Sequence, residues 1–357
     1  MRIPMSLVLP ALVLTLAAQQ ISGPLTAEQR RAVVEALAKE LQARYVFPEV
    51  AEKTGAALKA RAAKGAYDGA TTTQAFAEAL SKDLREVGQD GHFRVRFDPE
   101  FKPMSDDDDK PPTREEVAQM RQFSQRRAFG IAKVEQLAGN VGYLDVRGFG
   151  PTEFVGPAFT AALSILSGTE ALILDLRQNG GGDPESVAYL VSHFFEEGDT
   201  RHLNSIYNRP RNTTRQYWTS PTVGVRYTRP VYVLVSGRTF SGGEECAYDF
   251  QTQKRATLVG ETTGGGANPG GAVLLGHGFH AFIPTGRAIN PVTGTNWEHV
   301  GVKPEVAVSA AEALKVAHAT ILKAILEKEK DPEYRKRLEG ILSRVEKGEP
   351  EPVRYGR

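Results

Sequence analysis

The apolar positions of the first hundred residues recur at helical spacing. Over residues 26–45 they fall on one helical face, formed by Val33, Val34, Leu37, Leu41 and Tyr45. Similar stripes predict a second helix from Pro48 to about Ala63 and a third over Thr71–Val87. Residues 92–97 then alternate between polar and apolar side chains as a strand does. We therefore predict a small helical domain over residues 24–99.

From Asn140 onward the pattern changes to apolar runs that alternate with helical stripes. The predicted strands are VGYLDVRGF, ALILDLR, PVYVLVS and ATLVG, and the predicted helices lie near residues 153–166, from about 183 to 195, and from Gly242. Such near-continuous apolar strands between helices are typical of a mainly parallel α/β sheet that is covered on both faces. Residues 270–308 read as further strands and turns, and residues 309–357 as a charged helical segment.

Residues 100–136 join these two parts. They contain several prolines and four successive aspartates, at positions 106–109, which predict an exposed connection. A calcium site could be imagined here, but adjacent aspartates point in different directions and lack the alternating ligands of calcium loops.

The first eighteen residues resemble a signal peptide. Arg2 precedes an apolar run from Met5 to Ala18, and polar glutamines follow. The run is shorter than the roughly 20 residues that span a bilayer. We expect export with cleavage near residues 15–18, giving a periplasmic or extracellular protein without a stable membrane anchor; an uncleaved anchor is the alternative. The single cysteine, Cys246, excludes an internal disulfide.

Composition narrows the range of partners. Of 357 residues, 41% are hydrophobic and 24% charged, and the net charge is +1, so nothing favours a nucleic-acid partner. Neither glycine-rich run is followed by the Gly-Lys-Ser/Thr of a phosphate-binding loop, and the dinucleotide spacing is absent. We expect no cofactor and no metal site; the oligomeric state stays open.

Two predicted strand ends carry unusual residues. One strand runs into Gly181 and Gly182, and another runs into Ser241 and Gly242 just before a helix. Ligands of parallel sheets bind outside the carboxyl ends of the strands. Glycine amides beside a serine suggest an oxyanion hole and a nucleophile, whereas the simpler interpretation is a tight turn and a helix cap. The base could be any of seven histidines: His92, His193, His202, His277, His280, His299 and His318.

Four ordered segments, DLRQNGGG, TFSGGEECAY, VGETTGGGANPGG and WEHVGVKPEV, resemble the S41 family of serine peptidases. The branch that is most similar contains the interphotoreceptor retinoid-binding protein modules and the core of tricorn protease. The resemblance covers about residues 24–308. It implies a crotonase-like (ClpP/crotonase) α/β catalytic domain at residues 137–308, preceded by the helical domain.

The resemblance also implies site residues. Ser241 matches the nucleophile, His92 the base and Glu298 the acidic member, so that the site would lie between the two domains. Gly242 would supply one oxyanion amide, and Gly181 or Gly182 the other.

Three features depart from other members of the family. GETTGGGA lacks the lysine of the Ser-Lys branch, residues 98–137 are too few for a PDZ domain, and Gly91 stands where tricorn has a serine. His299 would point to the other side of an extended segment and is left out of the predicted site.

These residues predict a serine endopeptidase that acts on peptides or unfolded protein segments. One alternative is a non-catalytic module of the same fold that binds a hydrophobic ligand such as a retinoid or fatty acid. Another is an α/β-hydrolase esterase, whose histidine would follow the serine, at His280 or His318. That fold wants glycine two residues before the nucleophile, where this chain has Thr239.

Overall fold

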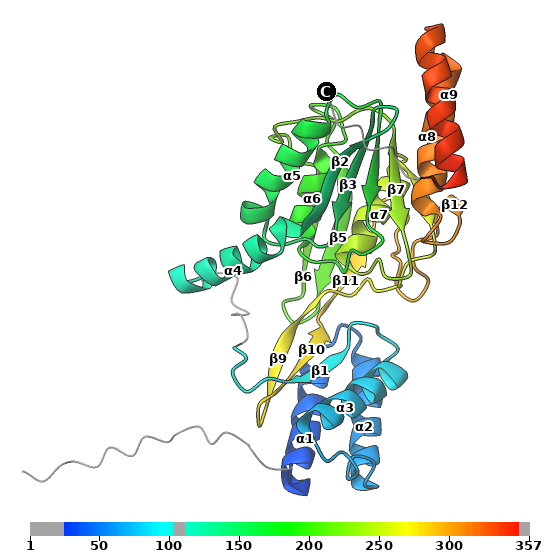
Figure 1. The fold of residues 1–357 in the computed structure, drawn as a ribbon. Coiled ribbons are helices and arrows are strands. Elements are labelled where there is room, and N and C mark those ends of the chain that lie inside the picture. Colours follow the sequence, from blue (N-terminus) through cyan, green and yellow to red (C-terminus); the bar gives the residue numbers. More distant parts are fainter. Residues whose placement is uncertain (1–24, 103–110, 350–357) are drawn as a thin grey trace, which may run out of the picture.

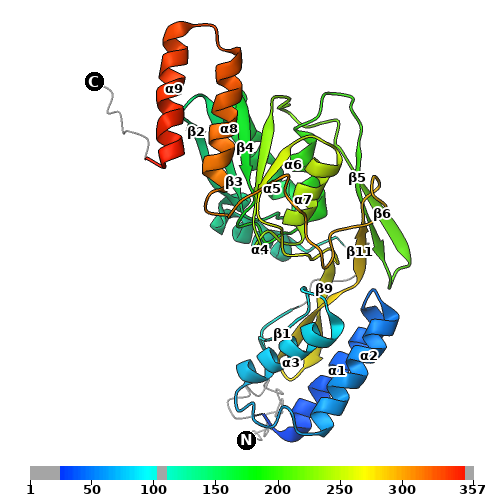
Figure 2. The same ribbon diagram turned by 90° about the vertical axis from the view of Figure 1, so that its right-hand side faces the viewer.

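The computed structural model describes residues 25–102 and 111–349. A helical part and a larger α/β part lie at opposite ends of the molecule, and a long hairpin passes between them (Figures 1 and 2). The predicted signal peptide and the four aspartates lie outside the described residues.

A six-stranded sheet forms the centre of the α/β part, in the order β12-β8-β7-β4-β3-β2. Its strands are β2 (Ile131–Leu137), β3 (Val141–Val146), β4 (Ala171–Asp175), β7 (Val231–Val235), β8 (Thr257–Gly260) and β12 (Val306–Ala307). Only the β2–β3 pair is antiparallel; every other neighbouring pair is parallel. The prediction of a mainly parallel α/β sheet is therefore confirmed.

Helices cover both faces of this sheet, which explains why its inner strands are almost entirely apolar, apart from Asp145 and Asp175 near their carboxyl ends. On one face, Leu144 and Val146 join a core with α5 (Thr152–Leu166), α6 (Pro184–Ser192) and α7 (Gly242–Thr252). On the other face, Val141 and Tyr143 pack with α8 (Ala313–Lys328). The last helix, α9 (Pro332–Lys347), packs on α8.

The helical part consists of α1 (Ala27–Arg44), α2 (Pro48–Ala63) and α3 (Thr73–Gly88), close to the predicted ranges. Thr26 and Gln29 form the capping box that begins α1, with side-chain bonds to backbone N–H groups of 2.9 and 3.1 Å. None of the described helices has the length and apolar character needed to cross a bilayer.

A hairpin from the second half of the chain completes the core of the helical part. Strands β9 (Gly270–Gly276) and β10 (Phe279–Pro284) pair with β1 (Arg94–Phe97) in the order β1-β10-β9, with Arg94 opposite Phe282. The buried residues of the hairpin, Val273, Leu275, Phe279, Ala281 and Ile283, belong to the same apolar cluster as α1 and α3. The two parts therefore interlock, and neither is one continuous stretch of chain.

The segment predicted as an exposed connection also contains regular structure. Helix α4 (Arg114–Arg126) and a short helix η1 (Ala128–Gly130) lie within residues 100–136, and β2 begins there and ends at Leu137. A third sheet, β11-β5-β6, is formed by β5 (His202–Asn208), β6 (Thr213–Trp218) and β11 (Gly286–Ile289).

Candidate active site

The loops that follow β4 and β7 meet at the carboxyl edge of the central sheet. Asn179, which is fully buried, holds them together. Its side-chain amide donates to the Val146 carbonyl (3.0 Å), its side-chain oxygen accepts from the Gly181 N–H (2.8 Å), and its carbonyl accepts from the Phe240 N–H (3.0 Å). Three strand ends are thereby fixed relative to one another.

Ser241 stands at the start of α7 in an unusual backbone conformation, with φ 53° and ψ −123°. Such a conformation is costly for a residue with a side chain and is kept only where the surroundings impose it. Gly181 lies directly against it: a Cβ on Gly181 would come within 2.7 Å of Ser241 Cβ and 2.8 Å of the Gly242 nitrogen. The φ of 97° at Gly181 likewise requires glycine.

Two backbone amides beside Ser241 are available to a ligand. Within the described residues, the N–H groups of Gly182 and Gly242 donate no hydrogen bond, whereas that of Gly181 is taken by Asn179. The two glycines are adjacent, because a Cβ on Gly242 would lie 3.0 Å from the Gly182 nitrogen. Of the two glycines that the sequence left open, only Gly182 thus has an uncommitted amide.

His92 comes from the turn between α3 and β1 and is 5% exposed. Its ring packs against Phe240, the residue before Ser241, at 4.6 Å between centroids, and against Phe282 at 6.0 Å. Neither ring nitrogen makes a hydrogen bond with a described residue. The structure thus brings His92 next to the serine segment without a hydrogen bond to Ser241. Catalytic hydrogen bonds are often long or misaligned before substrate binds.

Asp90 is the carboxylate that faces His92. Its Oδ1 lies 3.4 Å from Nδ1 of the imidazole and accepts the His92 backbone N–H at 2.9 Å. The other oxygen accepts from Asn268 (2.9 Å) and the Tyr45 hydroxyl (3.2 Å). Burial opposes ionisation, but the nearby His92 imidazole and the hydrogen bonds from Asn268 and the His92 backbone N–H outweigh it and hold the Asp90 pKa below its usual value.

Glu298 makes no hydrogen bond or ion pair with His92 among the described residues. Its Oε2 accepts the Ala267 N–H at 2.5 Å, while its Oε1 is buried without a hydrogen bond and lies 3.7 Å from Nδ1 of His299. Burial, followed by the charges of Asp90 and Glu244, raises the Glu298 pKa to about 8. The segment is a turn with His299 at φ 64°, so the two side chains do not point apart as they would in an extended strand.

The Glu244 carboxylate links a further loop, residues 261–266, to Ser241 through hydrogen bonds. One carboxylate oxygen accepts from the Thr263 hydroxyl (2.5 Å) and the Gly265 N–H (2.6 Å). The other accepts from the N–H groups of Gly266 (2.8 Å) and Ser241 (2.9 Å). Burial still raises the Glu244 pKa, although these four donors oppose the rise. The side chain therefore positions the nucleophile segment.

A small cavity of about 20 Å³ lies beside Ser241, lined also by Gly182, Gly242, Glu245 and Trp297. This volume holds about one water molecule. Glu245 is 5% exposed, and its Oε1 has no hydrogen-bond partner among the described residues. Burial raises the pKa of Glu245, and burial together with the charge of Glu245 raises that of Asp249 one helical turn further. Protonation of Glu245 would avoid placing an unpaired negative charge where an oxyanion would form.

The histidines required by the esterase alternative lie elsewhere. His280 is on β10, where it stacks on Phe101 at 3.9 Å, and His318 is on α8, where its Nε2 lies 2.8 Å from the Ala138 carbonyl oxygen. Neither lines the cavity beside Ser241. Among residues 25–102 and 111–349, no group of three or more His, Cys, Asp or Glu side chains could hold a metal ion.

The sequence pointed to Ser241, His92 and the glycines, but Asp90, Glu244 and Asn179 were not singled out. Asp90 stands two residues before His92, a spacing that lets a carboxylate cap the intervening turn, and Glu244 stands three residues after Ser241. Those two spacings were the signals by which the sequence could have indicated Asp90 and Glu244. The hydrogen-bond partners of these two residues in the loops at residues 263–268 are distant in the sequence.

Comparisons with known proteins agree with this architecture. The model of peptidase family S41 matches residues 140–308, and that of the N-terminal domain of Peptidase_S41 in eukaryotic IRBP matches residues 18–129. Carboxyl-terminal-processing peptidase 1, chloroplastic, of Arabidopsis thaliana is 26% identical over 164 residues, which are 46% of this chain and 33% of that protein. The chain thus spans about a third of the length of this curated relative.

Solved structures share the fold. A protein of Parabacteroides merdae ATCC 43184 superposes with a TM-score of 0.56 at 20% identity, covering 82% of this chain and 96% of that one. The tricorn protease gives a TM-score of 0.51 at 14% identity, covering 90% of this chain and 37% of the other. With both family models matching in their expected order, the chain belongs to peptidase family S41.

Proposed function

We propose that this chain is a serine peptidase that hydrolyses peptide bonds in peptides or unfolded protein segments. The observation that carries the proposal is the pair of uncommitted amides, Gly182 and Gly242, beside a strained serine at the start of α7. Acyl transfer needs donors aimed at the carbonyl oxygen as it becomes negative, and the positive end of a helix adds to their effect. Membership in the family and the similarity to a processing peptidase support this chemistry.

In the proposed reaction, the Ser241 hydroxyl attacks the scissile carbonyl carbon and gives its proton to His92. Because Nδ1 of His92 faces Asp90, Nε2 is the nitrogen left for the serine. The carbonyl oxygen becomes the oxyanion held by Gly182 and Gly242. His92 then returns the proton to the leaving amine, and water hydrolyses the acyl-enzyme by the same steps.

We propose that Asp90 orients the His92 imidazole. Glu298, which the sequence predicted for this role, acts only indirectly, through the loop that it binds. Asp90 lies 3.4 Å from the ring and its lowered pKa keeps it charged at neutral pH. Glu298 has a raised pKa and bonds the loop at Ala267, so it supports the wall of the site. Because neither ring nitrogen of His92 bonds a described residue, the imidazole must change its position to accept the Ser241 hydroxyl proton.

The test is labelling with a fluorophosphonate probe, which reacts with activated serines. The full chain should be labelled, mass spectrometry should place the label on Ser241, and Ser241→Ala should abolish it. His92→Ala should cost about as much activity as Ser241→Ala, and the double variant little more, because the two act as a unit. A folded protein that resists the probe would instead support a ligand-binding module.

We further propose that the protein acts after export, as a periplasmic or extracellular enzyme. The support is the charged, apolar and polar order of the first twenty residues. Sequencing the amino terminus of the protein recovered from outside the cytoplasm should show a start near residues 15–19. Recovery of the intact chain from the cytoplasm would contradict this.

A further inference from the structure

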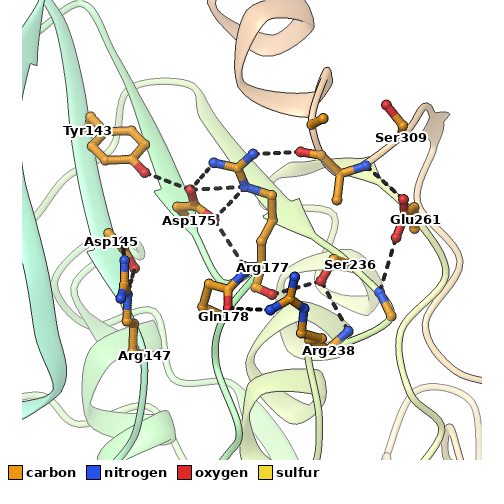
Figure 3. A pocket seen from close by; sticks show the side chains of 13 residues that line it. Tyr143, Asp145, Arg147, Asp175, Arg177, Gln178, Ser236, Arg238, Glu261 and Ser309 are labelled. Carbon is orange, nitrogen blue, oxygen red and sulfur yellow. Dashed lines mark hydrogen bonds and ion pairs between the residues drawn. The ribbon is translucent and has the colours of Figure 1, made fainter.

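A second cavity, of about 720 Å³, lies at the carboxyl ends of the central strands, but its charges balance one another (Figure 3). Three arginines and three carboxylates line it: Arg147, Arg177, Arg238, Asp145, Asp175 and Glu261. Two of the arginines form ion pairs with the two aspartates, with shortest N–O distances of 2.9 and 2.6 Å. This cavity therefore offers no net charge to a ligand.

Unbalanced positive charge lies instead on β1. The register places Arg94 beside Phe282 of β10, and Arg96 beside His280 of the same strand. Val95, between the two arginines, is buried in the apolar cluster that contains residues of α1 and α3. Because successive side chains of a strand point to opposite faces, both arginines point away from these helices. We call the surface formed by Arg94, Arg96 and Phe282 the arginine face.

The two guanidinium groups of the arginine face have no carboxylate partner. Both side chains are exposed, and within residues 25–102 and 111–349 neither makes a hydrogen bond or an ion pair. Arg85, near the end of α3, adds a third charge and donates to a backbone carbonyl at 3.1 Å. Partial burial, followed by the positive charges of Arg96 and Arg85, lowers the pKa of Arg94. Asp98, two residues after Arg96, accepts a backbone N–H at 3.1 Å and forms no ion pair with it.

The arginine face begins at the proposed base. His92 stands two residues before Arg94, and its ring stacks on Phe282, the cross-strand neighbour of Arg94, with 6.0 Å between centroids. In the proposed reaction His92 gives its proton to the leaving amine, so the part of the substrate that follows the scissile bond lies on the side of His92. A strand rises about 3.3 Å per residue, so side chains about two and four residues beyond that bond match the spacing of Arg94 and Arg96.

We propose that the arginine face binds acidic side chains of the substrate on the leaving side of the scissile bond. The inference rests on the proposed function, because the position of His92 in the reaction defines that side. Guanidinium groups bind carboxylates through paired hydrogen bonds, and two unpaired guanidinium groups on one face complement two acidic side chains of an extended chain. A peptide is favoured over other anions because a ligand seated there continues directly into the space beside His92.

The experiment is calorimetric titration of full-length Ser241→Ala, which cannot turn peptides over. Two octapeptides are compared that differ only in carrying three glutamates or three glutamines. Both are acetylated and amidated, so that neither has a terminal carboxylate. We expect the acidic peptide to bind about five- to thirtyfold more tightly at low salt, as two exposed ion pairs allow. At about 1 M salt, where charges are screened within about 3 Å, most of this difference should disappear.

Matched variants show whether the arginine face is responsible. Replacing Arg94 and Arg96 together by glutamine should bring the affinities of the two peptides to within about twofold of each other. The control is Lys39→Gln combined with Lys53→Gln, which removes the same charge from exposed positions of α1 and α2 and should preserve the difference. Circular dichroism shows whether each variant is folded.

The side of the scissile bond is tested with the wild-type chain and a mixture of peptides of varied sequence. Mass spectrometry of the products should show aspartate and glutamate enriched about two to four residues after the cleaved bonds. The same enrichment should be lost when Arg94 and Arg96 are both glutamine. Enrichment of acids before the cleaved bonds instead would contradict the assignment to the leaving side.

Equal affinity for the two octapeptides, or an unchanged difference in a folded variant that lacks both arginines, would overturn the proposal. Tighter binding of a single-stranded oligonucleotide of equal charge through the same arginines would overturn the peptide as ligand. A preference for the acidic peptide that appears only after the aspartates at positions 106–109 are replaced by asparagine would make the chain's own acids the occupant. Fluorophosphonate labelling of the wild-type chain reports on the proposed function separately, so the two can fail independently.

Discussion

Replacing Glu298 by glutamine should stabilise the protein increasingly as pH rises from about 5 to 8. The carboxyl has a pKa of 4.5 when exposed and about 8 in the folded protein, because of burial and then the charge of Asp90. Below pH 4.5 both states hold the proton. Between the two values the unfolded chain releases it while the folded chain keeps it, so the stability of the wild type falls with pH. Glutamine does not titrate and removes this loss.

The size of the effect follows from the two pKa values. Their difference of about 3.5 pH units corresponds to about 5 kcal/mol at 1.36 kcal/mol per unit. The carboxyl is not fully removed from solvent, and its Oε2 keeps the Ala267 hydrogen bond, so we discount this to about 2 kcal/mol.

The assay is urea unfolding of both proteins at pH 5, 6, 7, 8 and 9, with stability extrapolated to water. Glu327→Gln, which changes an exposed carboxylate on α8, serves as the control and should give a difference that does not grow with pH. Any cost of burying the new amide is independent of pH. The diagnostic quantity is therefore the slope with pH of the difference in unfolding free energy between Glu298→Gln and wild type. A difference between Glu298→Gln and wild type that stays constant across the range would refute the reasoning.

Three further substitutions test the site. Asp90→Asn should lower kcat on a fluorogenic peptide by about 10²–10⁴-fold, because the imidazole loses its charged partner. This loss should exceed that of Glu298→Gln, and a larger loss for Glu298→Gln would mean that Glu298 orients the imidazole. Gly181→Ala should abolish fluorophosphonate labelling, because its Cβ would meet Ser241 Cβ at 2.7 Å, whereas Gly180→Ala, with open space around it, should keep the label; equal effects would contradict the packing described. Glu245→Gln should retain more activity than wild type as pH rises above 7, because burial raises the pKa of Glu245 and its ionisation at higher pH places a negative charge beside Ser241. Superimposable pH–activity profiles of the two proteins would rule this out.

Local pattern was sufficient for most helices and for the inner strands of the central sheet, but not for α4, which lies in the predicted connection. The stripe of Val33, Leu37 and Leu41 predicts α1 because a helix repeats every 3.6 residues, whatever the rest of the chain does. The apolar runs at β3 and β4 likewise predicted strands covered on both faces.

The pairing of distant segments could not be predicted in this way. Strand β1 pairs with β10 across almost the whole α/β part, and such partners leave no mark in either local pattern. The strand β2 was missed because its polar positions, such as Lys133 and Glu135, face outward at the edge of the sheet. The helical domain therefore extends beyond its predicted range by a hairpin.

The residues of the candidate site likewise divide into those that local sequence pattern could indicate and those that it could not. Ser241 and the pair Gly181 and Gly182 could be singled out as candidates because each follows a strand and carries its own steric or chemical signature. The position of Asp90 depends on Tyr45 and Asn268, and that of Glu298 on Ala267, which are contacts made only in the folded chain. Sequence spacing could not decide which carboxylate faces the imidazole.

The most direct test of the proposed chemistry is a crystal structure of the chain after reaction with a fluorophosphonate. The account predicts phosphorus bonded to Ser241 Oγ, with the phosphonyl oxygen about 2.7–3.1 Å from the amide nitrogens of both Gly182 and Gly242. A phosphonyl oxygen turned away from these amides, or a label on any other residue, would contradict it.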